Sequence, residues 1–298
     1  MRLKADVTLL IVSFIWGSAF VAQRIAGQMG SVYLFNAARY LLAAFAVLPL
    51  AVRASRFANP TFLSRSQYKW MLIAGALLFA GSALQQAGVV YTTAGNAGFI
   101  TGLYVVLVPI ALFFVWGEKP HWFSILAVGL AVAGAFLLST GGKFEIQTTG
   151  DLLVFMSALF WTFHVITLGK YASRFEAMSF SVGQLLVCGV LNLALGIVVE
   201  PLPALGWTWV GAVAYTGIFS LALAYTLQIW AQRHTPPADA ALLLSLESVF
   251  AALAGWLFLD ERLAALQIFG CALIFIAVLL SQFKESALMK RSHLTEGR

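Results

Sequence analysis

Two stretches that echo each other decide the fold of this chain: DVTLLIVSFIW at residues 6–16 and DLLVFMSALFW at residues 151–161. Each begins with an aspartate and reaches a tryptophan ten residues later. A second pair follows at nearly the same offset, LYVVLVPIALFFVWGE at 103–118 and LESVFAALAGWLFLDE at 246–261. In the same alignment Arg39 falls opposite Gln184. A chain built twice over in this way predicts two like halves.

The composition indicates the solvent in which the chain folds. Of its 298 residues 61% are hydrophobic and 10% are charged, whereas a soluble domain carries about a quarter charged residues. The 48 residues between Lys69 and Glu118 hold no charge, which is enough for two membrane spans of about 20 residues each and a tight turn. These runs do not alternate apolar and polar residues as barrel strands do. The sequence therefore predicts an all-α membrane protein.

Ten transmembrane helices are expected from the apolar runs. Lysine and arginine number 14 on the side of the two termini and three on the opposite side, and this bias marks the cytoplasmic side. Each half holds five helices, an odd number, so the second half enters the membrane from the opposite side. Inverted halves around a central site are suited to alternating access. The expected helices are 7–25, 32–52, 70–90, 95–116, 121–139, 150–169, 177–198, 207–231, 238–259 and 264–283, divided into two inverted five-helix repeats at 1–145 and 146–285 with a cytoplasmic tail at 286–298.

The first helix carries a family likeness. FIWGSAF at residues 14–20 resembles the first-helix signature of the drug/metabolite transporter superfamily, in its ten-helix EamA branch. The family usually has Gly-Glu where this chain has Asp260-Glu261, and often a proline where it has Ser248. The resemblance implies a carrier in the bacterial inner membrane, with a cavity between the halves that helices 1, 3, 4, 6, 8 and 9 mainly line. Further matches lie at Arg39, Pro109, Gly117-Glu118, Asp260-Glu261 and Gly270.

Two ionisable side chains inside the spans are candidates for coupling transport to protons. Glu247 lies about 12 Å along its helix from Asp239 and about 21 Å from Glu261 at 1.5 Å per residue. An ionisable group at that depth costs several kcal/mol and usually faces a cavity or a partner. Glu247 either binds a proton or a substrate amine, or it is a structural carboxyl. His164 lies within a span and either titrates with transport or caps a packed interface.

Arg39 is a third charged group within a span, roughly two turns inside helix 2. It could bind a substrate carboxylate, extend to the outer interface or brace a helix end. Because the resemblance implies that helix 2 is mostly peripheral to the cavity, a structural role is favoured for Arg39.

Aromatic residues near mid-span are candidates for the cavity wall. Trp16 and Trp161 are repeat partners, and tryptophans of the interfacial belts lie near the headgroups instead. Packing or cavity lining are therefore the two roles open to them. Tyr104, Tyr225 and Phe99 could add further aromatic walls, which would suit flat, apolar or cationic solutes.

Polar residues gather around the hairpin between helices 3 and 4. Ser82, Gln86 and Asn96 could hydrogen-bond a substrate or join helices to one another, and joining helices is favoured. In the second half Pro236-Pro237 occupies the equivalent turn. We expect the two hairpins to be moving gates.

The leading functional interpretation is a secondary transporter that exports amino acids, aromatic ones favoured, or related metabolites by alternating access. A multidrug or nucleobase-type metabolite carrier is the alternative. No nucleotide-binding loop is present, so the solute gradient or protons, and not ATP, would drive transport. An intramembrane enzyme would need a nucleophile–base pair or a metal motif such as HExxH. This chain has no HExxH motif, so an enzyme is disfavoured. A channel usually repeats its filter around an axis normal to the membrane, whereas the repeat expected here is inverted, so a channel is disfavoured as well.

The remaining composition constrains partners. The net charge is +6, but the basic residues lie in short loops and at the ends, which indicates topology and not nucleic-acid binding. Cys188 and Cys271 lie inside apolar runs, far apart and without a CxxC partner, so we interpret both as packing residues. The expected partners are a small-molecule substrate and the lipid bilayer, with no cofactor or metal, and the chain is compatible with a monomer.

Overall fold

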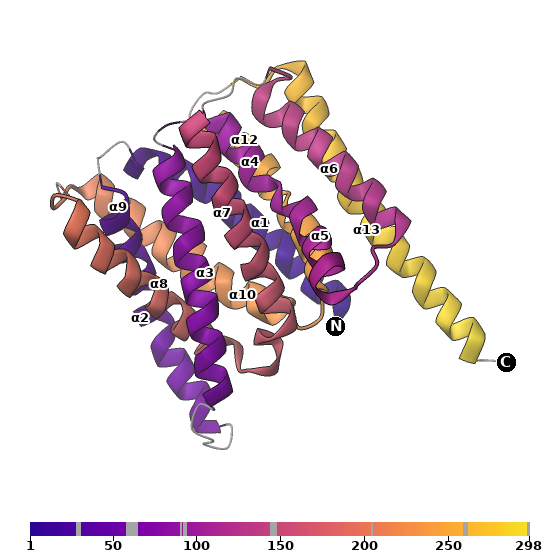
Figure 1. Cartoon of the computed structure of the whole chain (residues 1–298), viewed down its shortest axis with the longest axis horizontal. Helices are drawn as coiled ribbons and strands as arrows, with labels where there is room; N and C mark the ends of the chain where they lie inside the picture. Colours follow the sequence, from indigo (N-terminus) through magenta and orange to yellow (C-terminus); the bar gives the residue numbers. More distant parts are fainter. Residues whose placement is uncertain are drawn as a thin grey trace.

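The computed structural model describes residues 1–27, 31–57, 65–89, 91, 94–143, 148–203, 205–258 and 262–296, and these residues form ten helical segments (Figure 1). This agrees with the ten predicted spans. Seven segments are uninterrupted: α1 (Arg2–Gly27), α2 (Tyr33–Phe57), α3 (Arg65–Val89), α6 (Trp122–Thr140), α7 (Thr148–Lys170), α8 (Ala177–Val199) and α13 (Ala265–Glu296). Helix α13 runs on through most of the predicted tail. A short 3-10 turn, η1 (Ala172–Arg174), follows α7.

The surface of the bundle is apolar and its interior holds polar groups. Eight segments in the described ranges are long and apolar enough to cross a membrane, and Ala265–Leu280 adds a shorter apolar stretch. Phe114 and Val198 are among the large hydrophobic residues that face outward, whereas Asn36, Ser157 and Asn192 are fully buried. This distribution is expected where lipid surrounds the bundle and polar groups must find partners inside it. The protein is a multi-span membrane protein.

Three segments are interrupted near mid-membrane. The fourth consists of α4 (Ala94–Gly102) and α5 (Tyr104–Trp116), and the ninth of α11 (Pro237–Leu244) and α12 (Glu247–Phe258). The break at Leu103 and the break at Ser245 and Leu246 occupy equivalent positions in the two halves. Leu103 (φ −61°, ψ −15°) and Ser245 (φ −61°, ψ −17°) keep dihedral angles of the right-handed helical region, so each break is a local tightening of the helix.

The eighth segment contains a π-helical stretch. Here α9 (Trp207–Tyr215) is followed by η2 (Thr216–Leu223) and α10 (Ala224–Ala231). The equivalent segment of the first half, α3, is a regular α-helix throughout. Because π-helical turns are rare and occur frequently at functional sites, η2 marks this segment as different from its counterpart.

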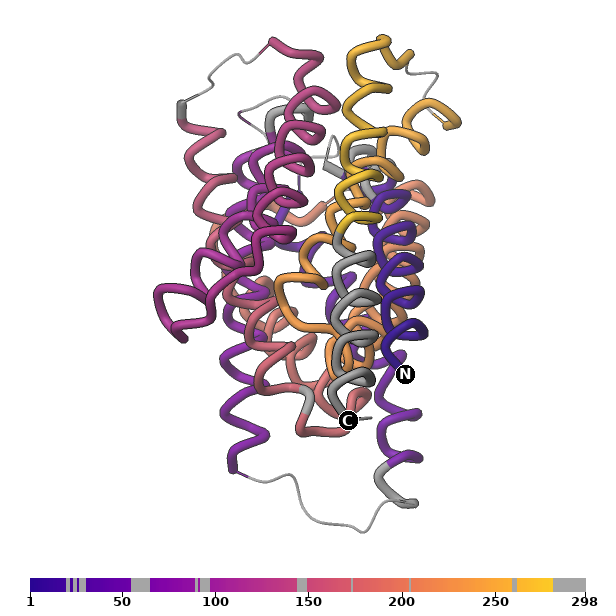
Figure 2. The backbone as a smooth tube through the Cα atoms, turned by 90° about the vertical axis from the view of Figure 1, so that its right-hand side faces the viewer, coloured from indigo at the N-terminus to yellow at the C-terminus, as the bar shows by residue number. Residues whose placement is uncertain are grey.

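Helices from the two halves pack closely against each other. Helix α2 packs along α8, and α6 runs beside α13 (Figures 1 and 2). At the α6–α13 crossing, a Cβ on Gly134 would lie 2.6 Å from the carbonyl oxygen of Gly270. Glycines therefore allow the two backbones to approach, as in other membrane helix pairs. We call the membrane face at which α1 begins the terminal face (Figure 2); with ten crossings the chain also ends there.

Candidate functional site

A cavity of about 80 Å³ lies between the two halves. On the same scale one water molecule takes about 10–15 Å³, so the cavity has room for about five to eight waters or for one small solute. Segment 2 contributes to its wall, in addition to the six helices that the family resemblance implied. The lining residues are Trp16, Gln23, Arg39, Tyr40, Gln85, Thr101 and Tyr104 from the first half, and Trp161, His164, Val165, Ser220, Leu221, Tyr225, Gln228, Leu244 and Glu247 from the second.

Aromatic rings and His164 form one continuous wall of the cavity. The ring centroids of Trp16 and Tyr225 lie 5.1 Å apart. His164 packs edge-on against Tyr225 at 5.8 Å and against Trp161 at 6.0 Å. Edge-to-face contacts of this kind are favourable for aromatic rings. The repeat partners Trp16 and Trp161 thus lie at either end of a single chain of contacts.

The two tryptophans differ in their hydrogen bonds. Trp16 Nε1 donates to the backbone oxygen of Ser220 at 2.8 Å, within the π-helical stretch. Trp161 Nε1 is buried and has no hydrogen-bond partner among the described residues. The Trp161 ring lies against Gly81, where an added Cβ would be 3.1 Å from ring atom Cε2. Gly81 therefore leaves the room that the indole of Trp161 needs at the cavity.

Tyr104 and Glu247 meet where the two interrupted segments break. Each is the first residue of the helix after the break, α5 and α12 respectively. The Tyr104 hydroxyl donates to Glu247 Oε1 at 3.4 Å. The two residues are repeat partners, so the contact joins equivalent points of the two halves.

Two further polar pairs surround the cavity. His164 Nε2 lies 3.0 Å from Gln184 Oε1, and His164 is buried. Gln85 Nε2 donates to Thr101 Oγ1 at 3.0 Å. The first pair lies in the second half of the chain and the second pair in the first half. Gln184 Nε2 is buried and has no hydrogen-bond partner among the described residues.

Arg39 lies in the cavity wall with 4% of its surface exposed. Its Nε donates to Asn36 Oδ1 at 3.0 Å, and its guanidinium carbon lies 5.2 Å from the ring centroid of Phe35 and 5.3 Å from that of Tyr40. Arg39 is thus a lining residue of the cavity, and both the structural role favoured from the sequence and the alternative of binding a carboxylate stay predictions. Helix 2 lies closer to the cavity than the family resemblance implied.

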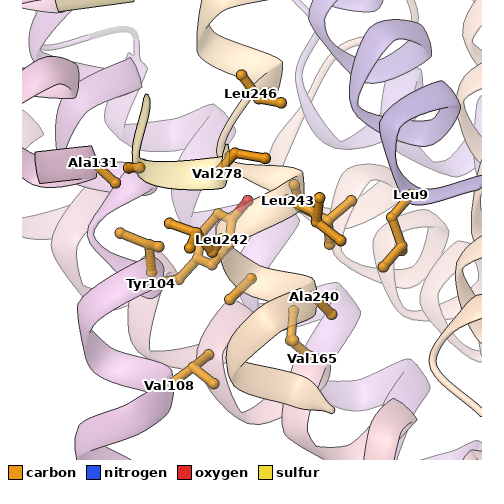
Figure 3. Close-up of a cluster of buried hydrophobic side chains, with 14 of the residues drawn as sticks. Leu9, Tyr104, Val108, Ala131, Val165, Ala240, Leu242, Leu243, Leu246 and Val278 are labelled. Atoms are coloured by element: carbon orange, nitrogen blue, oxygen red, sulfur yellow. The ribbon is translucent and has the colours of Figure 1, made fainter. Parts of the chain in front are cut away.

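A cluster of buried hydrophobic side chains (Figure 3), which we call the hydrophobic plug, lies about one to two helical turns from the cavity residues Trp16, Tyr104, Trp161 and Glu247, toward the terminal face. Leu9 on α1, Val108 on α5, Val165 on α7 and Leu243 on α11 are buried in one cluster. Two contacts lie where segments 8 and 9 meet α7. Gln232 Nε2 donates to the Val165 oxygen at 3.0 Å, and a Cβ on Gly169 would lie 2.6 Å from Pro237 Cγ. These contacts between α7 and segments 8 and 9 add to the packing beside the plug.

The structure brings six of the predicted site residues together and separates three others from the cavity. Ser82 donates to the Phe79 oxygen at 3.2 Å, Phe99 packs on Phe136 at 5.4 Å, and Gln86 is half-buried outside the lining. The side chain of Asn96 and the Asp260-Glu261 pair lie outside the described residues. The six residues that line the cavity are Trp16, Tyr104, Trp161, His164, Tyr225 and Glu247.

Sequence reasoning missed the three glutamines of the cavity, Gln23, Gln85 and Gln228. Gln228 is 1% exposed, and neither its Nε2 nor its Oε1 has a hydrogen-bond partner among the described residues. A primary amide within an apolar span is costly to bury, and that signal was present in the sequence. The described residues hold no cluster of three metal-ligating side chains. Cys188 and Cys271 are free thiols.

Helices of membrane-spanning length, breaks near the middle of two segments and a cavity between the two halves define the class of this protein as a membrane transporter. The EamA-like transporter family matches the chain twice, at residues 3–140 and 148–283. The chain belongs to the EamA-like transporter family.

Similar proteins include an uncharacterized transporter of Archaeoglobus fulgidus, 33% identical over 94% of this chain and 86% of that protein. The uncharacterized inner membrane transporter YedA of Escherichia coli K12 is 23% identical over 91% and 88%. The threonine/homoserine exporter RhtA of Salmonella typhimurium LT2 is 27% identical over 56% of each chain. A solved crystal structure matches with a TM-score of 0.81 over 97% of this chain and 99% of the other, at 18% identity, which establishes likeness of fold.

Proposed function

We propose that this protein is a secondary carrier that exports amino acids or related metabolites across the bacterial inner membrane by alternating access. The observation that carries the proposal is the cavity between the halves, which holds polar and charged side chains and lies beside the hydrophobic plug. A carrier needs a central site that is accessible from one side at a time. The excess of lysine and arginine at the terminal face supports a cytoplasmic location for both termini.

Packing within the bundle supports an inverted relation between the halves. Helix α3 packs on α7, and its repeat counterpart α10 packs on α1. Helix α1 packs on α12, and likewise α7 packs on α5. Exchanging the two halves therefore reproduces the pairs of neighbours. Because each half holds five spans, a two-fold axis that exchanges them lies in the membrane plane, as alternating access by inverted repeats requires.

The packing between helices differs between the two ends of the cavity, as is expected if the cavity is closed on one side of the membrane. Near the terminal face α7 packs on α11. In the described ranges, extensive packing of their repeat counterparts α1 and α4 is absent. We interpret this conformation as closed toward the cytoplasm, with the α7–α11 contact as the closure that must open during transport.

Cavity size and wall chemistry favour a small polar solute. The volume of about 80 Å³ is well below the range of about 300–1,000 Å³ usual for drug-sized ligands, which argues against a multidrug carrier in this conformation. The partial similarity to a threonine/homoserine exporter supports amino acids. The aromatic wall supports the aromatic amino acids expected from the sequence, although this conformation has more room for smaller ones.

Glu247 and His164 are our candidates for coupling to protons. Both border the cavity, and each has a single neutral hydrogen-bonding partner, Tyr104 and Gln184 respectively. A proton gained or lost at either residue changes the charge of the cavity wall where a solute would bind. The solute gradient is the alternative driving force.

Counterflow in liposomes tests the proposal. Purified protein is reconstituted into vesicles loaded with one unlabelled member of a panel of amino acids, nucleobases and cationic drugs, and uptake of the same labelled compound is measured. We expect saturable exchange of small amino acids that vesicles without protein do not show. Non-saturable flux with an electrical conductance would indicate a channel, and exchange confined to nucleobases or drugs would refute amino-acid transport.

A further inference from the structure

Arg39 lacks the partner that its repeat counterpart has. The offset of 145 residues that relates Asp6 to Asp151 also relates Arg39 to Gln184 and Ala19 to His164. In the second half, His164 and Gln184 lie 3.0 Å apart and bind each other. In the first half, an alanine methyl group stands where the histidine would be. Among the described residues, the guanidinium has no counterpart of this hydrogen bond.

The same break in symmetry occurs at the cavity glutamines. The offset of 143 residues that relates Leu103 to Leu246 also relates Gln85 to Gln228 and Thr101 to Leu244. Gln85 binds Thr101, whereas the repeat counterpart of Thr101 is Leu244, which has no polar side-chain group, and neither amide atom of Gln228 has a partner among the described residues. A buried polar group without a partner costs about 1–3 kcal/mol. The cavity therefore presents polar atoms that the described residues leave for a ligand to satisfy.

The charge of Arg39 is not neutralised by the described residues. Ion pairs in these residues join Arg2 to Asp6 and Asp239, and Lys170 to Glu118. None includes Arg39. Its Nε is held by Asn36, and rings of Phe35 and Tyr40 flank it. With Nε occupied, the two terminal nitrogens form the end of the guanidinium fork that matches a carboxylate.

Glu247 supplies the opposite charge from another part of the wall. It lies on α12, which packs on α1 and α6, whereas Arg39 lies on α2, which packs on α8 and η2. The two charges border one cavity without forming an ion pair. A basic side chain and an acidic side chain that share a cavity and are not paired suit a ligand that carries both charges.

We propose that Arg39 binds the carboxylate of a zwitterionic amino acid and that Glu247 faces its ammonium group. This assignment rests on the proposed function and names the chemical groups that the carrier recognises. The guanidinium forms two parallel hydrogen bonds to the carboxylate. A substrate without a carboxylate leaves the buried guanidinium unsatisfied, so Arg39 determines specificity for acids over amides.

Competition of counterflow tests the assignment. Exchange of labelled threonine and phenylalanine is measured in the presence of three kinds of unlabelled inhibitor. The first are the amino acids themselves. The second are threoninamide and phenylalaninamide, which lack the carboxylate, and the third are 3-hydroxybutyrate and 3-phenylpropionate, which lack the amine. We expect the wild type to prefer each amino acid over its amide by at least about 30-fold, the loss usual for an unpaired buried charge. Arg39→Gln abolishes this preference and leaves the inhibition constants of the amides within about threefold. Glu247→Gln instead reduces the preference over the amine-free acids.

Controls separate the possible failures. Arg174→Gln makes the same substitution outside the cavity lining and is expected to keep the wild-type preferences. If Arg39→Gln does not fold, two other measurements test the role of Arg39. One is the ratio of the inhibition constants of amide and amino acid in the wild type. The other is the same ratio in Arg39→Lys, which keeps the charge without the guanidinium fork. Equal inhibition of the wild type by acid and amide overturns the role of Arg39 and leaves the carrier function standing. A wild type that exchanges no member of the panel overturns the proposed function itself.

Discussion

Gly169→Ala is predicted to open the closure between the cavity and the terminal face. An added Cβ would lie 2.6 Å from Pro237 Cγ and 3.1 Å from Cδ, whereas ordinary contacts are 3.4–4 Å. Pro237 must therefore move by about 0.8–1.4 Å relative to Gly169. Its ring is bonded to its own backbone and cannot rotate away, so α11 and α7 must separate.

The destabilisation at the Gly169–Pro237 contact applies only to the conformation in which α7 and α11 touch. Overpacking of this kind costs about 1–3 kcal/mol, and it applies while α7 and α11 touch. A conformation open at the terminal face is spared that cost. The ratio of open to closed protein should therefore rise by about 5- to 150-fold.

Cysteine labelling measures the shift. Leu244 lines the cavity and is fully buried, so Leu244→Cys reports access once Cys188 and Cys271 are replaced by alanine. A membrane-impermeant thiol reagent is added at the terminal face of oriented vesicles. We expect Gly169→Ala to accelerate labelling from that face by about 5- to 150-fold.

Gly129→Ala is the matched control, because no atom lies within 4 Å of a Cβ added at Gly129. It should leave the labelling rate unchanged. An unchanged rate in Gly169→Ala, with helix content and gel-filtration profile equal to the wild type, would show that the α7–α11 contact does not control access from the terminal face.

Three further predictions follow from individual contacts. Gln228→Leu removes a buried amide that has no partner among the described residues, so the free energy of unfolding, measured by thermal unfolding in detergent, should rise by about 1 kcal/mol while counterflow falls. Gln85→Leu breaks the hydrogen bond to Thr101 and should lower the free energy of unfolding. A change of the same sign in both variants would contradict the difference in hydrogen bonding between the two glutamines. If Glu247 carries the coupling proton, Glu247→Gln should exchange solute but not concentrate it against a gradient when a pH difference is imposed; continued accumulation removes that role. Gly134→Ala and Gly270→Ala each force α6 and α13 apart at one crossing, so the double variant should cost at least about 0.5 kcal/mol less than the sum of the singles, whereas strict additivity would mean independent sites.

Much of the fold could be predicted because the bilayer imposes simple requirements. Spans of about 20 apolar residues must be helical, and the runs that end near Trp116 and Ala231 could be placed from the sequence alone. Gly102, beside the break at Leu103, is compatible with close packing or a bend, but the break at Leu246 has neither proline nor glycine beside it and could not be predicted. The π-helical stretch at Thr216–Leu223 was likewise missed, since its residues differ little from those of a regular apolar helix.

The site was harder to predict because both faces of a membrane helix are apolar. The lipid-facing side and the packed side of such a helix carry similar residues, so periodicity does not say which face borders the cavity. A position near mid-span was sufficient to predict that Trp16 and Trp161 could line the cavity. It was not sufficient to choose between Gln85 and Gln86, neighbours that point in different directions, of which only Gln85 lines the cavity. Arg39 lines the cavity although its helix was expected at the periphery, because the position of a helix in the bundle depends on packing that the sequence does not show.

The contact between Tyr104 and Glu247 has a consequence for why one polypeptide holds both halves. Two identical five-helix chains around a two-fold axis would place the same residue on each side of this contact, either two tyrosines or two glutamates. Paired carboxylates at that distance repel each other. Identical chains would also supply two copies of Arg39 or two of Gln184. A cavity with one acidic and one basic pole thus requires the two halves to differ in sequence, and joining them in a single chain guarantees that unlike halves always meet.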